Sequence, residues 1–185
     1  MKVFTIYNTA GSLNTYLIGH ETGGDAIIID PGQIDLHLLD ILENNKYYIK
    51  SILLTHDHEN HTRGVKTLMK IYDSVIYCKS PLIYDYPAVA ISENRELNLS
   101  GFDIAIIEIP GHSDDSVVYQ IRNTLFTGDV ISSGRIGSAR NSVSKKLLQD
   151  NIVNKLFPLD DNFIIFPGHG SPTTLKIEKE FNPFI

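Results

Sequence analysis

The feature that most constrains the fold of this chain is a repeated pattern, in which a short apolar run is followed directly by a polar cluster containing histidine or aspartate. This pattern occurs four times, and five of the seven histidines lie in its polar clusters. The apolar runs are rich in Ile, Leu and Phe, which is typical of buried strands. A rigid sheet can present side chains from several strand ends to one point, so we predict sheets whose strand ends carry a polar site. The four apolar runs, each given with the polar cluster that follows it, are 51–54 with 55–61, 104–109 with 110–113, 125–127 with 128–129, and 163–166 with 167–170.

Strand and helix patterns alternate along the whole chain. Ile34, Leu38, Ile41 and Leu42 share one helical face, and Val65, Leu68, Met69 and Tyr72 share another. This alternation predicts strand-rich halves with helices packed outside them, an α/β sandwich. A chain of 185 residues is long enough to bury a core as a single domain over 1–185. Strands are expected at 26–29, 51–54, 75–78, 104–109, 117–121 and 163–166.

Two further helices are expected in the second half of the chain. One covers about 142–156, with Ser142 as its N-cap. A last short helix follows Ser171, with Leu175 and Phe181 on its inner side. The segment 81–99 shows no clear period and receives no assignment.

The charge balance and the apolar content narrow the class of protein. The net charge of −6 argues against binding to nucleic acid or to an anionic membrane surface. No run of about 18 apolar residues is present, so no membrane span is expected. The first residues resemble no signal peptide, and the single cysteine, Cys78, is expected to be a small buried hydrophobe in a reducing compartment. These observations predict a cytoplasmic protein.

The first polar cluster has a spacing that suits a metal ion. Residues two apart in an extended segment point the same way, so His56 and His58 can face one centre. His61 comes at the start of the following helix and can face a second centre. Glycine and proline beside His112 and His169 form tight turns that hold an imidazole in place. The two histidines outside the clusters, His20 and His37, are expected to be solvated.

At these residues the sequence resembles the metallo-β-lactamase superfamily, and within it the short glyoxalase-II-like members. The family's His-x-His-x-Asp-His motif is similar to 56–61 here. Its later histidine, bridging aspartate and final histidine match His112, Asp129 and His169 in order. Further similarity at 14–18, 30–32, 127–129 and 180–184 extends the resemblance over nearly the whole chain.

The resemblance implies a four-layer αββα sandwich with a metal site at the edge between its two sheets. One or two divalent ions are expected, zinc first, with iron or manganese as alternatives. The implied ligands are His56, His58 and His112 for the first ion, His61 and His169 with Asn60 at the family's aspartate position for the second, and Asp129 bridging both.

Asn60 is a departure from the family pattern. An amide oxygen can coordinate an ion, but it brings no negative charge and does not match a carboxylate. We expect the second ion to bind more weakly as a result, by at least the ~10–100-fold typical of disturbed outer-shell partners. The family's glycine-rich stretch is also changed, at 132–140, which can change the substrate.

The resemblance implies a hydrolase that cleaves a thioester or related small ester by metal-bound hydroxide, with Asp129 positioning that hydroxide. The partner is then a small-molecule substrate whose binding residues the sequence does not identify. No serine or cysteine nucleophile motif is present. A glutathione conjugate is less favoured, because full-length glyoxalase II enzymes add a C-terminal helical domain and this sequence ends 16 residues after His169. Two alternatives stay open: a mononuclear iron persulfide dioxygenase-like oxidoreductase, and a catalytically decayed metal-binding module.

Overall fold

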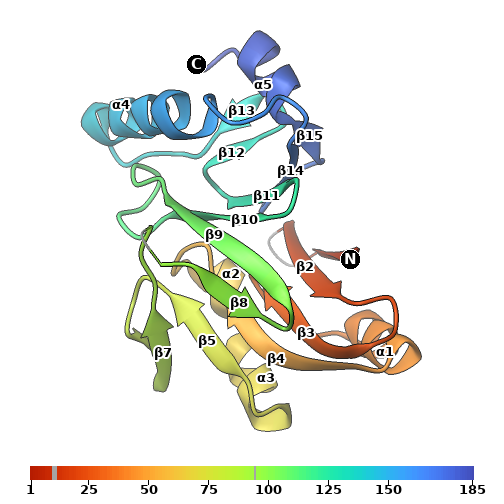
Figure 1. Cartoon of the computed structure of the whole chain (residues 1–185). Helices are drawn as coiled ribbons and strands as arrows, with labels where there is room; N and C mark the ends of the chain where they lie inside the picture. The colour runs from red at the N-terminus through yellow and green to blue at the C-terminus, as the bar shows by residue number, and fades with distance from the viewer. Residues whose placement is uncertain (10–11, 94) are drawn as a thin grey trace. The chain divides into compact units, whose positions relative to one another are not determined.

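The structure, a computed structural model, describes residues 1–9, 12–93 and 95–185. The chain divides into two compact units, which are described separately (Figure 1). The first unit comprises 1–90 and 98–102, and the second comprises 91–97 and 103–185. That the two behave as one domain stays a prediction.

The first unit is built on a seven-stranded mixed sheet with the order β1-β2-β3-β4-β5-β7-β6. β1, β2 and β3 pair antiparallel, whereas β3, β4, β5 and β7 pair parallel. The parallel strands are apolar over most of their length, as expected for strands with both faces covered. The strands are β1 Lys2–Asn8, β2 Leu13–Gly19, β3 Gly24–Ile29, β4 Tyr47–Leu53, β5 Val75–Cys78, β6 Leu82–Ile83 and β7 Tyr86–Ala90.

Three helices connect the parallel strands of this unit: α1 (Leu36–Asn45), α2 (Glu59–Thr62) and α3 (Val65–Ile71). α1 begins where the Asp35 side chain accepts a hydrogen bond from the Leu38 amide at 2.9 Å. The two predicted helical faces are confirmed, because their buried members pack into one core with the sheet. Those members are Leu38, Leu42, Val65 and Leu68, against Ile28, Ile49 and Ile52.

The second unit is built on most of a six-stranded sheet with the order β15-β14-β11-β10-β9-β8, of which two residues of β8 and the first residue of β9 belong to the first unit. β11 and β14 are parallel and pair at Gly128 and Pro167, so their carboxyl ends lie at the same edge. The strands are β8 Leu97–Leu99, β9 Phe102–Glu108, β10 Val117–Ile121, β11 Thr124–Gly128, β14 Ile164–Pro167 and β15 Thr173–Thr174, with a separate hairpin of β12 Ile131–Ser132 and β13 Arg135–Ile136.

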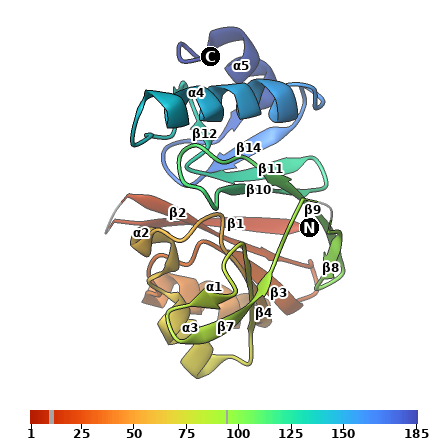
Figure 2. The same ribbon diagram turned by 90° about the vertical axis from the view of Figure 1, so that its left-hand side faces the viewer.

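Helices α4 (Ser142–Asn151) and α5 (Leu175–Phe181) lie on the same side of this sheet (Figure 2). A π-helical turn, Ile152–Leu156, continues α4 to the end of the predicted helix. The core contains Leu148, Ile152, Leu156 and Leu175 packed with Leu125 and Ile165.

Two details of these helices were predicted wrongly. The N-cap of α4 is Asn141, not Ser142, because the extended Asn141 backbone lets its side chain accept from the Ser144 amide at 2.8 Å. Phe181 is 71% exposed, whereas Leu175 is buried. Six residues advance a helix by about 600°, so these two side chains lie about 120° apart and cannot share an inner face.

The remaining fold predictions agree with the structure. The α/β class is confirmed, as are all six expected strands. The unassigned segment contains the short strands β6, β7 and β8, and Cys78 is buried. None of the helices in the described ranges combines the length and the apolar character needed to cross a bilayer.

Candidate metal centre

Three imidazoles lie together after β4 in the first unit. His56 and His61 are buried, and the loop and helix α2 bring their rings to a centroid distance of 4.1 Å. His56 Nε2 lies 2.8 Å from His58 Nδ1. The predicted first cluster therefore places two ring nitrogens where they can donate electron pairs toward one point.

The buried carboxylate of Asp30 holds this cluster. Its Oδ1 accepts from the Thr55 amide at 2.8 Å, and its Oδ2 accepts from the Thr55 hydroxyl at 2.6 Å. The same Oδ2 lies 2.9 Å from His61 Nδ1. Because a carboxylate accepts, His61 donates its Nδ1–H, which leaves Nε2 as the electron-pair donor. Asp30 thus fixes the tautomer and the orientation of His61.

Thr55 passes the same constraint to His56. Its hydroxyl proton is directed to Asp30, so the oxygen accepts from His56 Nδ1, which lies 3.0 Å away. Nε2 of His56 then carries the free electron pair. Behind this network, the Thr15 hydroxyl donates to the Asp30 backbone carbonyl at 2.7 Å and accepts from the Asn8 side chain at 2.8 Å. The loop that carries Asp30 is therefore fixed by buried polar groups.

The role of Asp30 was missed by sequence reasoning, which noted only the motif 30–32. A usable signal was present, since the apolar run 26–29 ends in Asp30 just as the four predicted runs end in polar clusters. The structure shows that this strand end belongs with the first cluster, through Thr55 and His61.

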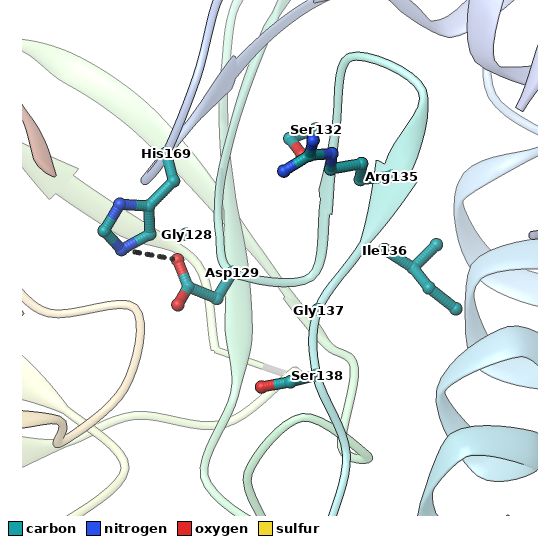
Figure 3. A pocket seen from close by; sticks show the side chains of 8 residues that line it. All are labelled: Gly128, Asp129, Ser132, Arg135, Ile136, Gly137, Ser138 and His169. Carbon is teal, nitrogen blue, oxygen red and sulfur yellow. Dashed lines mark ion pairs between the residues drawn. The ribbon is translucent and has the colours of Figure 1, made fainter. Parts of the chain in front are cut away.

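The second unit brings together His112, Asp129 and His169. Asp129 Oδ2 lies 3.6 Å from His112 Nε2, and Asp129 Oδ1 lies 3.5 Å from His169 Nε2 (Figure 3). Each carboxylate oxygen thus faces a different imidazole. The part of Asp129 as a ligand that bridges two cations stays a prediction.

His112 is oriented by a backbone carbonyl. Its Nδ1 lies 2.7 Å from the Ser138 oxygen, so Nδ1 donates and Nε2 keeps its electron pair on the Asp129 side. Gly137 makes this possible, since a Cβ there would lie 2.0 Å from the Asp129 carbonyl oxygen and 3.0 Å from His112 Nδ1. Neither Ser138 nor Gly137 was predicted to support the site, although both lie in the altered stretch 132–140.

The parallel pairing of β11 with β14 explains why Asp129 and His169 meet. Gly128 is paired with Pro167, and the Gly168 amide donates to the Gly128 carbonyl at 2.8 Å. Asp129 follows Gly128 and His169 follows Gly168, so both candidate ligands come directly after this pair of hydrogen-bonded glycines. The expected convergence at strand ends is present within this unit.

The remaining predicted residues are Asn60, His37 and His20. Asn60 lies on α2, half-buried, and its part as a ligand stays a prediction. His37 is exposed as expected. The expectation for His20 was wrong, because its ring stacks on Phe102 at 4.4 Å and its Nε2 lies 2.7 Å from the Ser100 carbonyl oxygen.

The donor set fits a divalent transition-metal ion. Each unit offers imidazole nitrogens whose second ring nitrogen is engaged by a carboxylate, hydroxyl or carbonyl, the usual support for a metal-bound histidine. Neutral imidazole with one carboxylate suits zinc, iron and manganese.

Comparison with known proteins identifies the same family in sequence and in fold. The sequence model of the metallo-beta-lactamase superfamily matches residues 8–96. Hydroxyacylglutathione hydrolase GloC of Haemophilus influenzae is 31% identical, over 100% of this chain and 98% of that protein. The BLEG-1 B3 metallo-beta-lactamase structure has a TM-score of 0.87 at 27% identity and covers 99% of each chain. TTHA1623, solved in a di-iron-bound form, has a TM-score of 0.82 at 27% identity, over 99% of this chain and 100% of that one.

Proposed function

Because the chain belongs to the glyoxalase-II-like branch of the metallo-β-lactamase superfamily, we propose that it is a metal-dependent hydrolase of thioesters or related small esters. The observation that carries this proposal is the Asp129 carboxylate, whose two oxygens face two different imidazoles at 3.6 and 3.5 Å. The expected metal is zinc, and iron or manganese would satisfy the same ligands.

The proposed ligands are those that the family motif indicates. They are His56, His58 and His112 for one ion, His61, His169 and Asn60 for the other, and Asp129 for both. A bound divalent ion supplies a polarised carbonyl and a water whose pKa is near 7. The protein's own part is to orient the imidazoles, and Asp30, Thr55 and Ser138 do this for His61, His56 and His112 through Nδ1, which leaves Nε2 of each ring to bind an ion.

Asp129 has a second part in the proposed reaction. Its carboxylate can accept a hydrogen bond from the attacking water and so orient that water toward the scissile carbonyl carbon. The Gly168 amide donates to the Gly128 carbonyl and so holds the backbone from which Asp129 projects, which limits the reorganisation needed at the moment of attack.

A thioester is the favoured substrate for two reasons. The relative GloC is named a hydroxyacylglutathione hydrolase and matches this chain over its full length. In addition, a thiol has a pKa of about 8.5, so a thiolate can act as the leaving group at neutral pH with little need of a general acid. A site that cleaves thioesters therefore has little need of a proton donor for the leaving group.

The proposal is tested by metal analysis combined with a thioester assay. Protein purified without added metal is analysed for metal identity and count, then supplied with zinc and given small acyl thioesters while free thiol is followed. Wild-type protein should release thiol, and Asp129→Asn should reduce kcat by about 10²–10⁴-fold, the range for loss of a proton-handling group. Failure of metal-loaded wild-type protein on thioester, ester and phosphodiester substrates would favour the decayed-module alternative.

Asn60 supports a second candidate, a mononuclear iron oxidoreductase. Loss of the family's aspartate weakens one of the two ion sites, and the TTHA1623 structure is described as di-iron-bound, so the fold accepts iron. An iron-to-protein ratio near one, with oxygen uptake on a persulfide, would favour this candidate. Zinc or manganese with no oxygen uptake would reject it.

A further inference from the structure

A pocket of about 170 Å³ opens beside Asp129 and His169 within the second unit (Figure 3). Its other wall is the β12–β13 hairpin, which contributes Ser132 and Arg135. A wider hollow, lined by Ser133 as well as Ser132, Arg135 and His169, continues from it. Arg135 therefore lines both spaces.

The guanidinium of Arg135 faces this space, and it has no partner among the residues that the structure describes. Across residues 1–9, 12–93 and 95–185, no ion pair or hydrogen bond of that group occurs. Other arginines of the chain behave differently, since Arg140 lies 3.6 Å from Asp114 and Arg63 lies 3.5 Å from Glu59. Arg135 is exposed, so its guanidinium is open to an external anion that enters the space beside Asp129 and His169.

In Figure 3 the Arg135 side chain runs past Ser132 toward the side of the pocket on which His169 lies. Arg135 and Ser132 are paired residues of the hairpin. A group bound by the guanidinium can therefore also receive a hydrogen bond from the Ser132 hydroxyl. A planar guanidinium offers paired N–H groups in a fork that matches a carboxylate or a phosphate.

The hairpin turn is tied to helix α5 by a buried carboxylate. Glu178, 1% exposed, accepts from the Gly134 amide at 3.0 Å, from Asn182 Nδ2 at 2.7 Å and from the Thr173 hydroxyl at 2.8 Å. Asn182 Nδ2 also donates to the Arg135 carbonyl at 3.2 Å. The backbone around Arg135 is thus held at the Gly134 amide and at the Arg135 carbonyl, which fixes the point from which the side chain extends before a ligand binds.

We propose that Arg135 binds an anionic oxygen group of the substrate, a carboxylate or a phosphate, and that Glu178 and Asn182 are positioning residues for it. The inference rests on the proposed function, because that function places the scissile bond beside Asp129. The substrate class is then a thioester that carries an acidic arm. Arg135 selects for that arm and takes no part in the bond cleavage.

The test measures binding and hydrolysis separately. The binding probes are 3-(benzylthio)propanoic acid, its neutral amide, and 3-(benzylthio)propyl phosphate, which contain no scissile thioester. Zinc-loaded wild-type protein should bind at least one of the anionic probes about tenfold or more tightly than the amide, in NMR titrations. The tighter of the acid and the phosphate identifies the group that the pocket prefers.

Arg135→Met should remove this preference, whereas Arg135→Lys should keep a part of it, because a lysine is charged but cannot bind in a fork. Arg140→Met is the matched control, since it removes the same charge from the same segment outside the pocket lining. It should leave the preference intact. If Arg135→Met binds the acid and phosphate as wild type does, those groups bind elsewhere, for instance on the metal, and the inference is wrong.

Positioning by Glu178 is tested with Glu178→Gln. This variant removes an acceptor from a site with three donors, so the hairpin turn should loosen and binding of the acidic probes should weaken while binding of the amide stays unchanged. A merely structural role would lower the melting temperature and change binding of all three probes alike, which would contradict the assignment.

Hydrolysis of 3-(acetylthio)propanoic acid and of its amide separates the two proposals. If neither thioester is cleaved but the acidic probes still bind through Arg135, the proposed function fails and the anion site stands. If both thioesters are cleaved equally well by wild type and by Arg135→Met, the hydrolase stands and the anion site fails. If kcat/KM for the acid alone falls in Arg135→Met, both are supported.

Discussion

His61 Nδ1 and Asp30 Oδ2 lie 2.9 Å apart, and both side chains are almost completely buried. Thirty-one residues separate them in the chain, and the loop after β3 meets helix α2 at this contact. The same carboxylate also accepts two hydrogen bonds from Thr55. One buried acid therefore orients His61 directly and His56 through Thr55.

Asp30→Asn should weaken metal binding without changing any proposed ligand. The amide has one acceptor oxygen where three donors converge, so at least one buried donor loses its partner, at a cost of about 1–3 kcal/mol in unfolding free energy. Metal affinity should fall by about 10–100-fold, as for other partners of metal-bound histidines. Zinc titration with a competing chelator measures this, and Asp25→Asn, an exposed position on β3, the strand that precedes Asp30, is the control.

His56→Ala should remove the ion that His56, His58 and His112 are proposed to hold. The expected result is the loss of about one metal per chain in elemental analysis, because the four proposed protein ligands, which include the shared Asp129, are reduced to three. His37→Ala, at an exposed position on α1, should retain the wild-type content. Full metal content in His56→Ala would contradict the proposed ligand set.

Asn60→Asp should raise occupancy of the second ion. The substitution restores the negative charge that the family has at this position, and a carboxylate binds zinc, iron or manganese better than an amide. The number of metal ions per chain at limiting zinc should therefore increase toward two. An unchanged stoichiometry would count against Asn60 as a ligand position.

Gly137→Ala should disturb Asp129 and His112 together. The added Cβ would lie 2.0 Å from the Asp129 carbonyl oxygen, a backbone atom that can move only with the strand end. We expect a loss of about 1–3 kcal/mol in unfolding free energy and a clear drop in activity. Denaturant unfolding and metal analysis measure the two effects. Gly24→Ala is the comparison, since a Cβ there meets nothing within 4 Å and only backbone strain at φ +95° remains.

Alkaline pH should destabilise the protein through Tyr16. Burial raises the pKa of this phenol well above its ordinary 10.0, and the nearby Asp30 charge raises it further. The folded state therefore favours the neutral phenol. This stability is fully present below pH 10, and it is lost as the pH rises toward the folded pKa, by up to about 1.4 kcal/mol per pH unit. Urea unfolding between pH 8 and 11 should show a smaller alkaline loss for Tyr16→Phe than for wild type, and equal slopes would refute this assignment.

Local pattern predicted much of this protein. The order of apolar runs and polar clusters indicated the strands, and the spacing of His56, His58 and His61 indicated a metal-binding cluster whose rings do lie together. Such features depend on residues close in the chain, where the two-residue period of a strand and the start of a helix are enough. The altered stretch 132–140 was also visible as a departure from the family.

The parts that the sequence did not reveal depend on contacts between distant residues. Asp30 reaches His61 across 31 positions, and Glu178 reaches Gly134 across 44. No local period encodes such partners, because a buried hydrogen bond is decided by which strands pair and how loops pack over them. The sequence by itself determined which candidate ligands are present and their order along the chain. Tertiary structure alone decided which nitrogen of His56, His61 and His112 keeps its electron pair, because that depends on the acceptor that folding brings to the opposite side of each ring.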